Sequence, residues 1–252
     1  MQNYLIFNTI TSLVKKNQFL PIDCEVGSDF SGTDTKELFQ KSLKTQPLNW
    51  EYRNKIIKYT LNSKGYRAPE FKKIDWANSI VVFGCSYVFG VGLDDEDTIC
   101  SQLAKITGIP VVNLGVSGSS ITYSLHNSII LKDGYPTPKA VVHLWTEYNR
   151  TVYYHRNQVR SYGPWNLVKN NYMDVWSNSN HHGATHALMA SITNKHLWGN
   201  TSYYEASFFS ETANLINCDY LKTIDTARDL SHPGLKTARI IASQIADNLK
   251  CK

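Results

Sequence analysis

The sequence has no long apolar run. No stretch approaches the roughly 18 consecutive apolar residues that a membrane-spanning helix needs. There is also no internal repeat and no low-complexity tract. Hydrophobic content of 42% and charged content of 19% are ordinary for a globular protein. A chain of 252 residues is long enough for one large domain with a full hydrophobic core.

Cysteines are few, and no secretory signal is evident. The five cysteines are an odd number, and their spacing fits neither a disulfide framework nor a zinc site. The apolar patch within residues 1–16 is followed, not preceded, by Lys15 and Lys16, and no small-residue cleavage site follows it. We therefore expect reduced thiols in a cytoplasm-like compartment.

The charge balance is only mildly basic. A net charge of +5 fits a solvated basic surface and gives no argument for nucleic-acid binding. We expect no nucleic-acid partner, no membrane span and no cofactor.

From Ile80 onward, strand-type and helical patterns alternate, which predicts parallel βαβ units. Residues 1–75 precede this alternation and are expected to be an N-terminal extension packed on the core, with residues 76–252 as the main domain. Residues 54–61 fit a helix or a strand. We expect strands at 79–83, 110–114, 140–145 and 219–223, and helices at 5–16, 35–43, 97–107, 118–131, 203–216 and from 233 onward.

Two short segments carry residues typical of hydrolytic chemistry. An apolar run ends at Gly84 and is followed by Ser86, which places a hydroxyl at the carboxyl edge of the predicted sheet. Near the other end of the chain, Asp229 and His232 lie on one short loop before Pro233. Serine, histidine and aspartate are the three parts of a hydrolytic triad.

Together with a third segment, these residues resemble the SGNH (GDSL-type) hydrolase family. Its first block, Gly-Asp-Ser, matches residues 84–86, with Cys85 in place of the aspartate. Its second block, Asn-x-x-x-Ser-Gly, matches residues 113–118, and its last block, Asp-x-x-His, matches residues 229–232. The resemblance covers roughly residues 76–252. It implies a flavodoxin-like three-layer α/β/α sandwich with a short parallel sheet.

The third block of the family, Gly-x-Asn-Asp, departs from the pattern. After the strand at 140–145, an ungapped alignment puts Glu147 where the family has asparagine. Asn149 takes that place only if the loop is two residues longer. Both alternatives remain open from the sequence.

The resemblance assigns the roles in catalysis. Ser86 is the expected nucleophile, His232 the base that removes its proton, and Asp229 the carboxylate that holds the imidazole. In the oxyanion hole we expect the backbone N–H of Ser86, that of Gly118, and the side-chain amide of Asn149. No metal ligand is expected.

Three other features of the sequence allow both a functional and a simpler structural interpretation. Cys85 is a rival nucleophile, but the resemblance gives that role to Ser86, and a buried small side chain is the simpler explanation of Cys85. His181, His182 and His186 have helical spacing but lack an acidic or cysteine partner, which favours a polar surface over zinc. The acidic residues at 94–97 are explained by a helix N-terminus rather than a metal.

Residues 150–200 interrupt the βαβ pattern. Seven large aromatic residues fall there, namely Tyr153, Tyr154, Tyr162, Trp165, Tyr172, Trp176 and Trp198. Because the segment follows the third strand, it is expected at the same sheet edge as Ser86. It is either a lid over the site or a structural subdomain with its own small aromatic core.

The sequence thus predicts a serine esterase that hydrolyses small acyl esters, O-acetyl above all, on carbohydrate through an acyl-serine intermediate. Alternatives are a lipid or thioester acylhydrolase, an acyltransferase with the same triad, and a non-catalytic carbohydrate-binding module on the same fold. The expected partner is a small-molecule or glycan ester.

Overall fold

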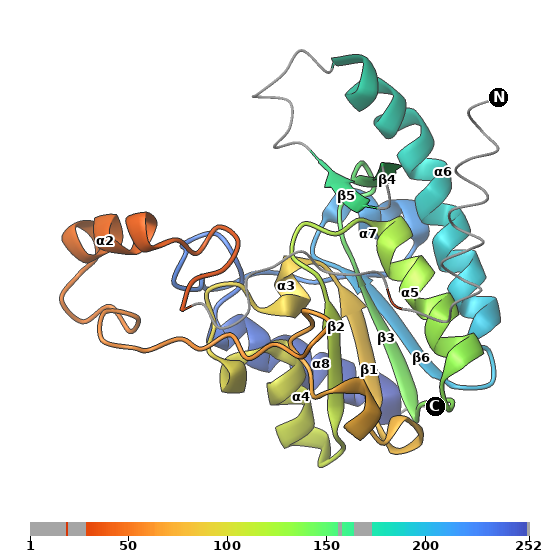
Figure 1. The fold of residues 1–252 in the computed structure, drawn as a ribbon, viewed down its shortest axis with the longest axis horizontal. Helices are drawn as coiled ribbons and strands as arrows, with labels where there is room; N and C mark the ends of the chain where they lie inside the picture. Colours follow the sequence, from red (N-terminus) through yellow and green to blue (C-terminus); the bar gives the residue numbers. More distant parts are fainter. Residues whose placement is uncertain (1–18, 20–28, 156–157, 164–172, 251–252) are drawn as a thin grey trace.

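The computed structural model describes residues 19, 29–155, 158–163 and 173–250 of the chain. Its centre is a parallel sheet of five strands in the order β2-β1-β3-β6-β7 (Figure 1). The strands are β1 (Ile80–Gly84), β2 (Val111–Gly115), β3 (Ala140–Trp145), β6 (Ser202–Ser207) and β7 (Asp219–Tyr220). The predicted α/β class with a short parallel sheet is confirmed.

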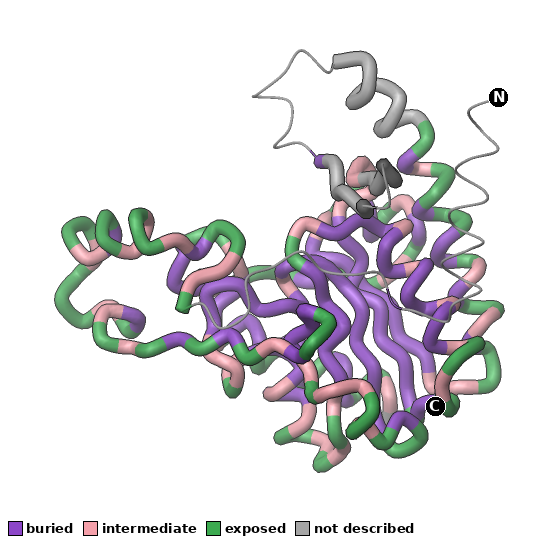
Figure 2. The backbone as a smooth tube through the Cα atoms, viewed as in Figure 1, coloured by how far each residue is buried: buried purple, intermediate pink, exposed green. Residues whose placement is uncertain are grey.

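Helices cover both faces of this sheet (Figure 1). α4 (Ile99–Thr107) and α8 (Leu235–Lys250) pack on one face, where they meet Ile80 and Val82 of β1. α5 (Ile121–Gly134) and α6 (Met173–Leu197) lie against the other face, which receives Val81 and Phe83. Every residue of β1 is buried, as expected for a strand covered on both sides. Figure 2 shows the buried positions concentrated in this sheet.

Two short helices stand at the carboxyl edge, α3 (Ser86–Phe89) after β1 and α7 (Ser210–Ile216) after β6. α3 lies directly over the ends of β1 and β2 because both strands end in glycine. A Cβ on Gly84 would come within 2.4 Å of Val88, and one on Gly115 within 2.4 Å of the Phe89 amide nitrogen. The paired glycines therefore fix the place where Ser86 leaves the sheet.

Two expectations about local structure are wrong. Residues 203–216 were expected to form one helix, but β6 occupies 202–207 and α7 follows from Ser210. Burial of Tyr203 and Tyr204 on opposite faces of the sheet suits a strand between two helical layers. Residues 54–61 form neither helix nor strand, although Ile57 and Tyr59 are buried in the core. The predicted helix at 5–16 lies outside the described residues.

The segment at 150–200 has regular structure. It contains an antiparallel hairpin of β4 (Thr151–His155) and β5 (Gln158–Tyr162), followed by α6. Figure 1 places the hairpin at the carboxyl edge of the sheet, while α6 runs alongside α5. Trp198 is fully buried against α5, where its indole N–H donates to Ser128, so this aromatic is structural. Trp165 and Tyr172 lie outside the described residues.

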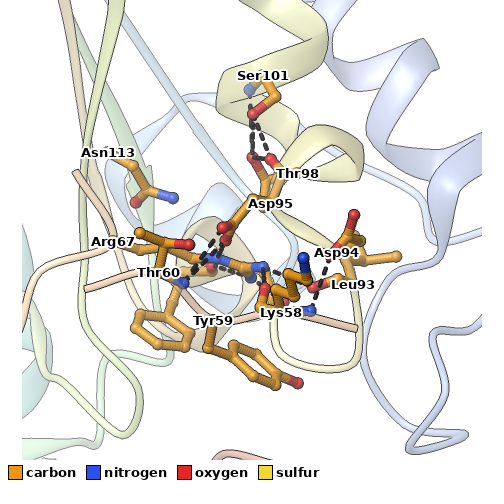
Figure 3. A network of polar contacts seen from close by, with 12 residues as sticks. Lys58, Tyr59, Thr60, Arg67, Leu93, Asp94, Asp95, Thr98, Ser101 and Asn113 are labelled. Atoms are coloured by element: carbon orange, nitrogen blue, oxygen red, sulfur yellow. Dashed lines mark hydrogen bonds and ion pairs between the residues drawn. The ribbon is translucent and has the colours of Figure 1, made fainter. Parts of the chain in front are cut away.

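Within the segment at residues 29–75, α2 (Lys36–Thr45) projects from the sandwich and is largely exposed (Figures 1 and 2). Short 3₁₀ turns lie at Phe71–Lys73, Trp76–Asn78 and Asp95–Asp97. Arg67 ties this segment to the loop after α3 (Figure 3). The buried guanidinium donates to Asp95 at 2.6 Å and to four main-chain carbonyls, those of Lys58, Phe89, Gly90 and Leu93. The loop that follows the Ser86 helix is thereby held in place.

Candidate active site

Ser86 is the first residue of α3 and is 6% exposed. Its hydroxyl lies 2.7 Å from Nε2 of His232, although the two residues are 146 positions apart in the chain. Nδ1 of the same imidazole lies 2.6 Å from Oδ2 of Asp229. An ionised carboxylate only accepts, so Nδ1 carries the hydrogen and Nε2 is left to accept the serine proton. The structure thus brings the three predicted triad residues together in the order that the chemistry needs.

The loop that carries Asp229 and His232 is held by the aspartate itself. Oδ1 of Asp229 accepts the backbone N–H groups of Ser231 at 3.1 Å and His232 at 3.0 Å. Leu230, between Asp229 and Ser231, adopts a positive φ of 60°, and the backbone N–H of Ala227 donates to the carbonyl of His232, which closes the loop. Asp229 and His232 therefore lie on a tight loop before α8, as the sequence predicted.

The environment of Asp229 favours its ionised form. Burial alone raises the pKa of this carboxyl group. The hydrogen bond and charge of His232, the hydroxyl of Thr33 and the backbone N–H of His232 act in the opposite direction and outweigh burial. The pKa of Asp229 therefore lies well below its ordinary range, and the carboxylate is available to orient the imidazole near neutral pH.

This depressed pKa predicts a pH-dependent contribution to stability. A carboxyl whose folded pKa lies below its unfolded pKa stabilises the fold above the unfolded value, about pH 4, and loses this contribution as pH falls toward the folded pKa. The difference in unfolding free energy between the native protein and Asp229→Asn should therefore shrink between about pH 5 and about pH 2. Denaturant unfolding at several pH values measures it. Asp247→Asn, an exposed position on α8, is the matched control. A difference that stays constant across this range would contradict the account.

The two residues expected to supply backbone donors, Ser86 and Gly118, follow β1 and β2, whose last residues Gly84 and Gly115 are paired in the sheet. Gly118 has a φ of 73°, and no heavy atom lies within 4 Å of the position a Cβ would occupy, so one side of this residue is open. Neither its N–H nor that of Ser86 has a hydrogen-bond partner among the described residues. Unpaired N–H groups are what an oxyanion hole requires.

The third-block residues occupy a neighbouring cavity. Glu147 and Asn149 line a cavity of about 300 Å³, together with Phe208, Phe209 and Tyr220. Glu147 accepts a hydrogen bond from Arg150 at 2.6 Å. No contact in the described part of the chain joins Asn149 to Ser86 or His232. Its backbone instead packs against α6, where a Cβ on Gly183 would lie 3.3 Å from Asn149 Cα. The role of Asn149 as a donor remains a prediction.

Three residues that the sequence did not single out contact the triad. The Tyr87 ring meets the imidazole of His232 edge-on at 5.2 Å and Phe208 at 4.9 Å. The hydroxyl of Ser231 donates to Asp229 at 2.7 Å, and that of Thr33 does so at 2.6 Å. Tyr87 and Ser231 are sequence neighbours of triad residues, which is a usable signal. Thr33 has none, because it lies 196 positions before Asp229.

Cys85 and the histidine cluster have simpler explanations than catalysis or zinc binding. Cys85 is 2% exposed and makes no described contact with His232. The rings of His182 and His186 stack on α6 with centroids 6.4 Å apart. Across the described ranges, no group of three or more acidic, histidine or cysteine residues could hold a metal ion. In the same ranges, no helix has the length and apolar character required to cross a bilayer.

The sequence matches no protein-family model, and no curated protein matches it. Solved structures that resemble the fold include the acetyl xylan esterase Est2A from the rumen bacterium Butyrivibrio proteoclasticus, with 10% identity and a TM-score of 0.47. That alignment covers 71% of this chain and 65% of the esterase, so the chain spans less than two thirds of that protein. A carbohydrate esterase family 2 enzyme from Corynascus thermopiles (Myceliophthora fergusii) is 12% identical, with a TM-score of 0.43. That alignment covers 69% of this chain and 67% of the enzyme.

AlinE4, an SGNH-hydrolase family esterase, is 12% identical over 71% of this chain and 98% of its own, with a TM-score of 0.35. Identities this low do not transfer a function from one protein to another. The functional argument therefore depends on the geometry of the site.

Proposed function

We propose that this protein is a serine esterase of the SGNH type that hydrolyses small acyl esters, O-acetyl above all, on carbohydrate. The observation that carries the proposal is the chain of contacts from Ser86 Oγ to His232 Nε2 at 2.7 Å and from His232 Nδ1 to Asp229 at 2.6 Å. A serine without such a base is a poor nucleophile.

In the proposed reaction, Ser86 Oγ attacks the ester carbonyl carbon while His232 Nε2 takes the hydroxyl proton. The carbonyl oxygen becomes an oxyanion, which the N–H groups of Ser86 and Gly118 stabilise. The tetrahedral intermediate collapses, and His232 gives its proton to the departing alcohol, leaving an acyl-serine. Water, deprotonated by the same imidazole, then attacks the acyl group. The second tetrahedral intermediate releases the carboxylic acid, and His232 Nε2 returns the proton to Ser86 Oγ.

The cavity lined by Glu147 and Asn149 supports a sugar alcohol as the leaving group. Phe208 and Phe209 place it next to the triad, because both rings contact Tyr87 and Tyr87 contacts His232. Aromatic rings suit the apolar faces of a sugar, and carboxylates such as Glu147 accept bonds from its hydroxyl groups. The cavity volume of about 300 Å³ suits a small ligand better than a long acyl chain.

The proposal is tested by hydrolysis of nitrophenyl esters of increasing acyl length, and by acetate release from acetylated and deacetylated xylo-oligosaccharides. We expect turnover of the acetyl ester to exceed that of the octanoyl ester, and acetate to be released from the acetylated sugar. A preference for the octanoyl ester would favour a lipid acylhydrolase. Sugar binding with no turnover of any ester would favour the binding module that the unusual third block suggests.

Asn149 provides a separate prediction on the oxyanion hole. If its amide donates to the developing oxyanion, Asn149→Ala should lower kcat by about 10²-fold and leave KM nearly unchanged. Asn248→Ala, the same change at an exposed position on α8, is the matched control and should retain most of the activity. Steady-state kinetics on an acetyl ester measures both. Unchanged kcat in Asn149→Ala would leave a hole with backbone donors only.

A further inference from the structure

The turn at residues 31–34 joins the N-terminal extension to the triad. Thr33 Oγ1 donates to Asp229 Oδ2 at 2.6 Å and lies 3.3 Å from His232 Nδ1. The same carboxylate oxygen accepts from His232 and Ser231, and the Asp229 side chain is fully shielded from solvent. Thr33 is thus a direct hydrogen-bond donor to the triad carboxylate.

The turn that presents Thr33 is well defined. Ser31 and Asp34 exchange two backbone hydrogen bonds of 3.1 Å, and Gly32 between them adopts a φ of 63°. A Cβ on Gly32 would lie 3.1 Å from Ser117 Oγ, in the loop that also carries Gly118. The turn therefore lies between the Gly118 loop and the Asp229 loop and forms one wall of the site.

A buried ion pair anchors this turn. Asp34 is 1% exposed and accepts from the Arg228 guanidinium at 2.8 and 2.9 Å. The Tyr59 hydroxyl donates to the same carboxylate at 2.6 Å. Arg228 directly precedes Asp229, so the residue that fixes the turn and the residue that receives the Thr33 hydrogen bond are consecutive in the chain.

We propose that Thr33 is a positioning residue of the active site, whose hydroxyl orients the Asp229 carboxylate toward His232, and that the turn at residues 31–34 completes the site from the N-terminal extension. The inference rests on the proposed serine-hydrolase chemistry for its kinetic consequence. The hydroxyl spreads the negative charge of Oδ2 over a further donor and prevents the carboxylate from rotating away from Nδ1.

Thr33→Val keeps the shape of the side chain and removes the donor. Without that donor, more negative charge remains on Asp229 and the protonated imidazole is favoured. We expect kcat for an acetyl ester to fall on the order of tenfold, with KM unchanged. The acid limb of kcat/KM should shift toward higher pH. Within the described chain, Asp229 and Tyr87 are the titratable side chains in contact with His232.

Two further variants separate positioning from folding. Thr33→Ser retains the hydroxyl and should restore kcat and the pH profile. Thr45→Val, an exposed threonine on α2 of the same extension, should leave both unchanged. Thermal unfolding of all three variants reports any loss of stability. A lower melting temperature in Thr33→Val with native kcat and pH profile would show a structural role only and overturn the proposal.

A readout independent of turnover separates this inference from the proposed function. The titration of His232, followed by NMR of its imidazole, should move to higher pH in Thr33→Val and return in Thr33→Ser, whether or not any ester is hydrolysed. If the native protein hydrolyses no ester but this titration moves, the esterase proposal fails and the positioning role stands. If the native protein is active and neither kcat nor the titration responds to Thr33→Val, the positioning role is wrong.

Discussion

Ser86→Ala is expected to lower hydrolysis of an activated acetyl ester by at least about 10⁴-fold while leaving the fold intact. The hydroxyl is the atom that forms the acyl intermediate, and losing a triad nucleophile removes nearly all of the rate enhancement of the triad. The side chain is small and its loss leaves only a slight void at the start of α3. Initial rates, together with circular dichroism of both proteins, measure the two effects.

Cys85→Ala is the matched control for this prediction. The thiol is adjacent in sequence but buried, and His232 contacts Ser86 instead. We expect Cys85→Ala to retain activity within a few-fold of the native protein. Loss of activity in Cys85→Ala with retention in Ser86→Ala would transfer the nucleophile to the thiol and overturn the assignment.

Asp34→Ala is expected to destabilise the protein by about 3–5 kcal/mol, the largest stability effect that we predict. The Arg228 guanidinium is buried and would be left without its carboxylate, although its contacts with the rings of Phe30 and Phe39 would remain. Denaturant unfolding measures the loss. Because Arg228 adjoins Asp229, esterase activity should fall in the same variant.

A more exposed ion pair provides the comparison. Lys55 and Asp97 form an ion pair in which the Lys55 side chain is 32% exposed. Lys55→Ala should therefore cost less than about 1 kcal/mol. The double change Asp34→Asn with Arg228→Met should recover part of the loss, since no charge is then left buried. Equal losses in Asp34→Ala and Lys55→Ala would contradict the role of the buried pair.

The sequence predicted the part of the fold that local patterns determine. Buried apolar runs gave β1, β2 and β3 within about one residue, because a strand covered on both faces leaves a continuous hydrophobic signature. β6 was missed, since its Ser-Tyr-Tyr-Glu-Ala-Ser sequence contains a buried glutamate. Glu205 is satisfied there by Trp145, Ser191 and Lys195, partners that no local pattern reveals.

The residues of the site also divide into those that local sequence reveals and those that only the fold brings together. Ser86, Asp229 and His232 could be found because each lies in a short block whose chemistry is visible along the chain. Thr33 and Arg67 could not, because their partners are 196 and 28 positions away and only the folded chain brings them together. The third block could not be aligned from the sequence for a related reason: the loop at 146–150 packs against α6 at Gly183, a contact that no local pattern reveals.

Reaction with a fluorophosphonate probe tests the central claim most directly, because it reports an activated serine whatever the substrate. The native protein at neutral pH should be labelled on one residue, and peptide mass spectrometry should place the label on Ser86. His232→Ala should label much more slowly, since the base that removes the Ser86 proton is gone. A native protein that remains unlabelled, or a label that maps to another residue, would contradict the account.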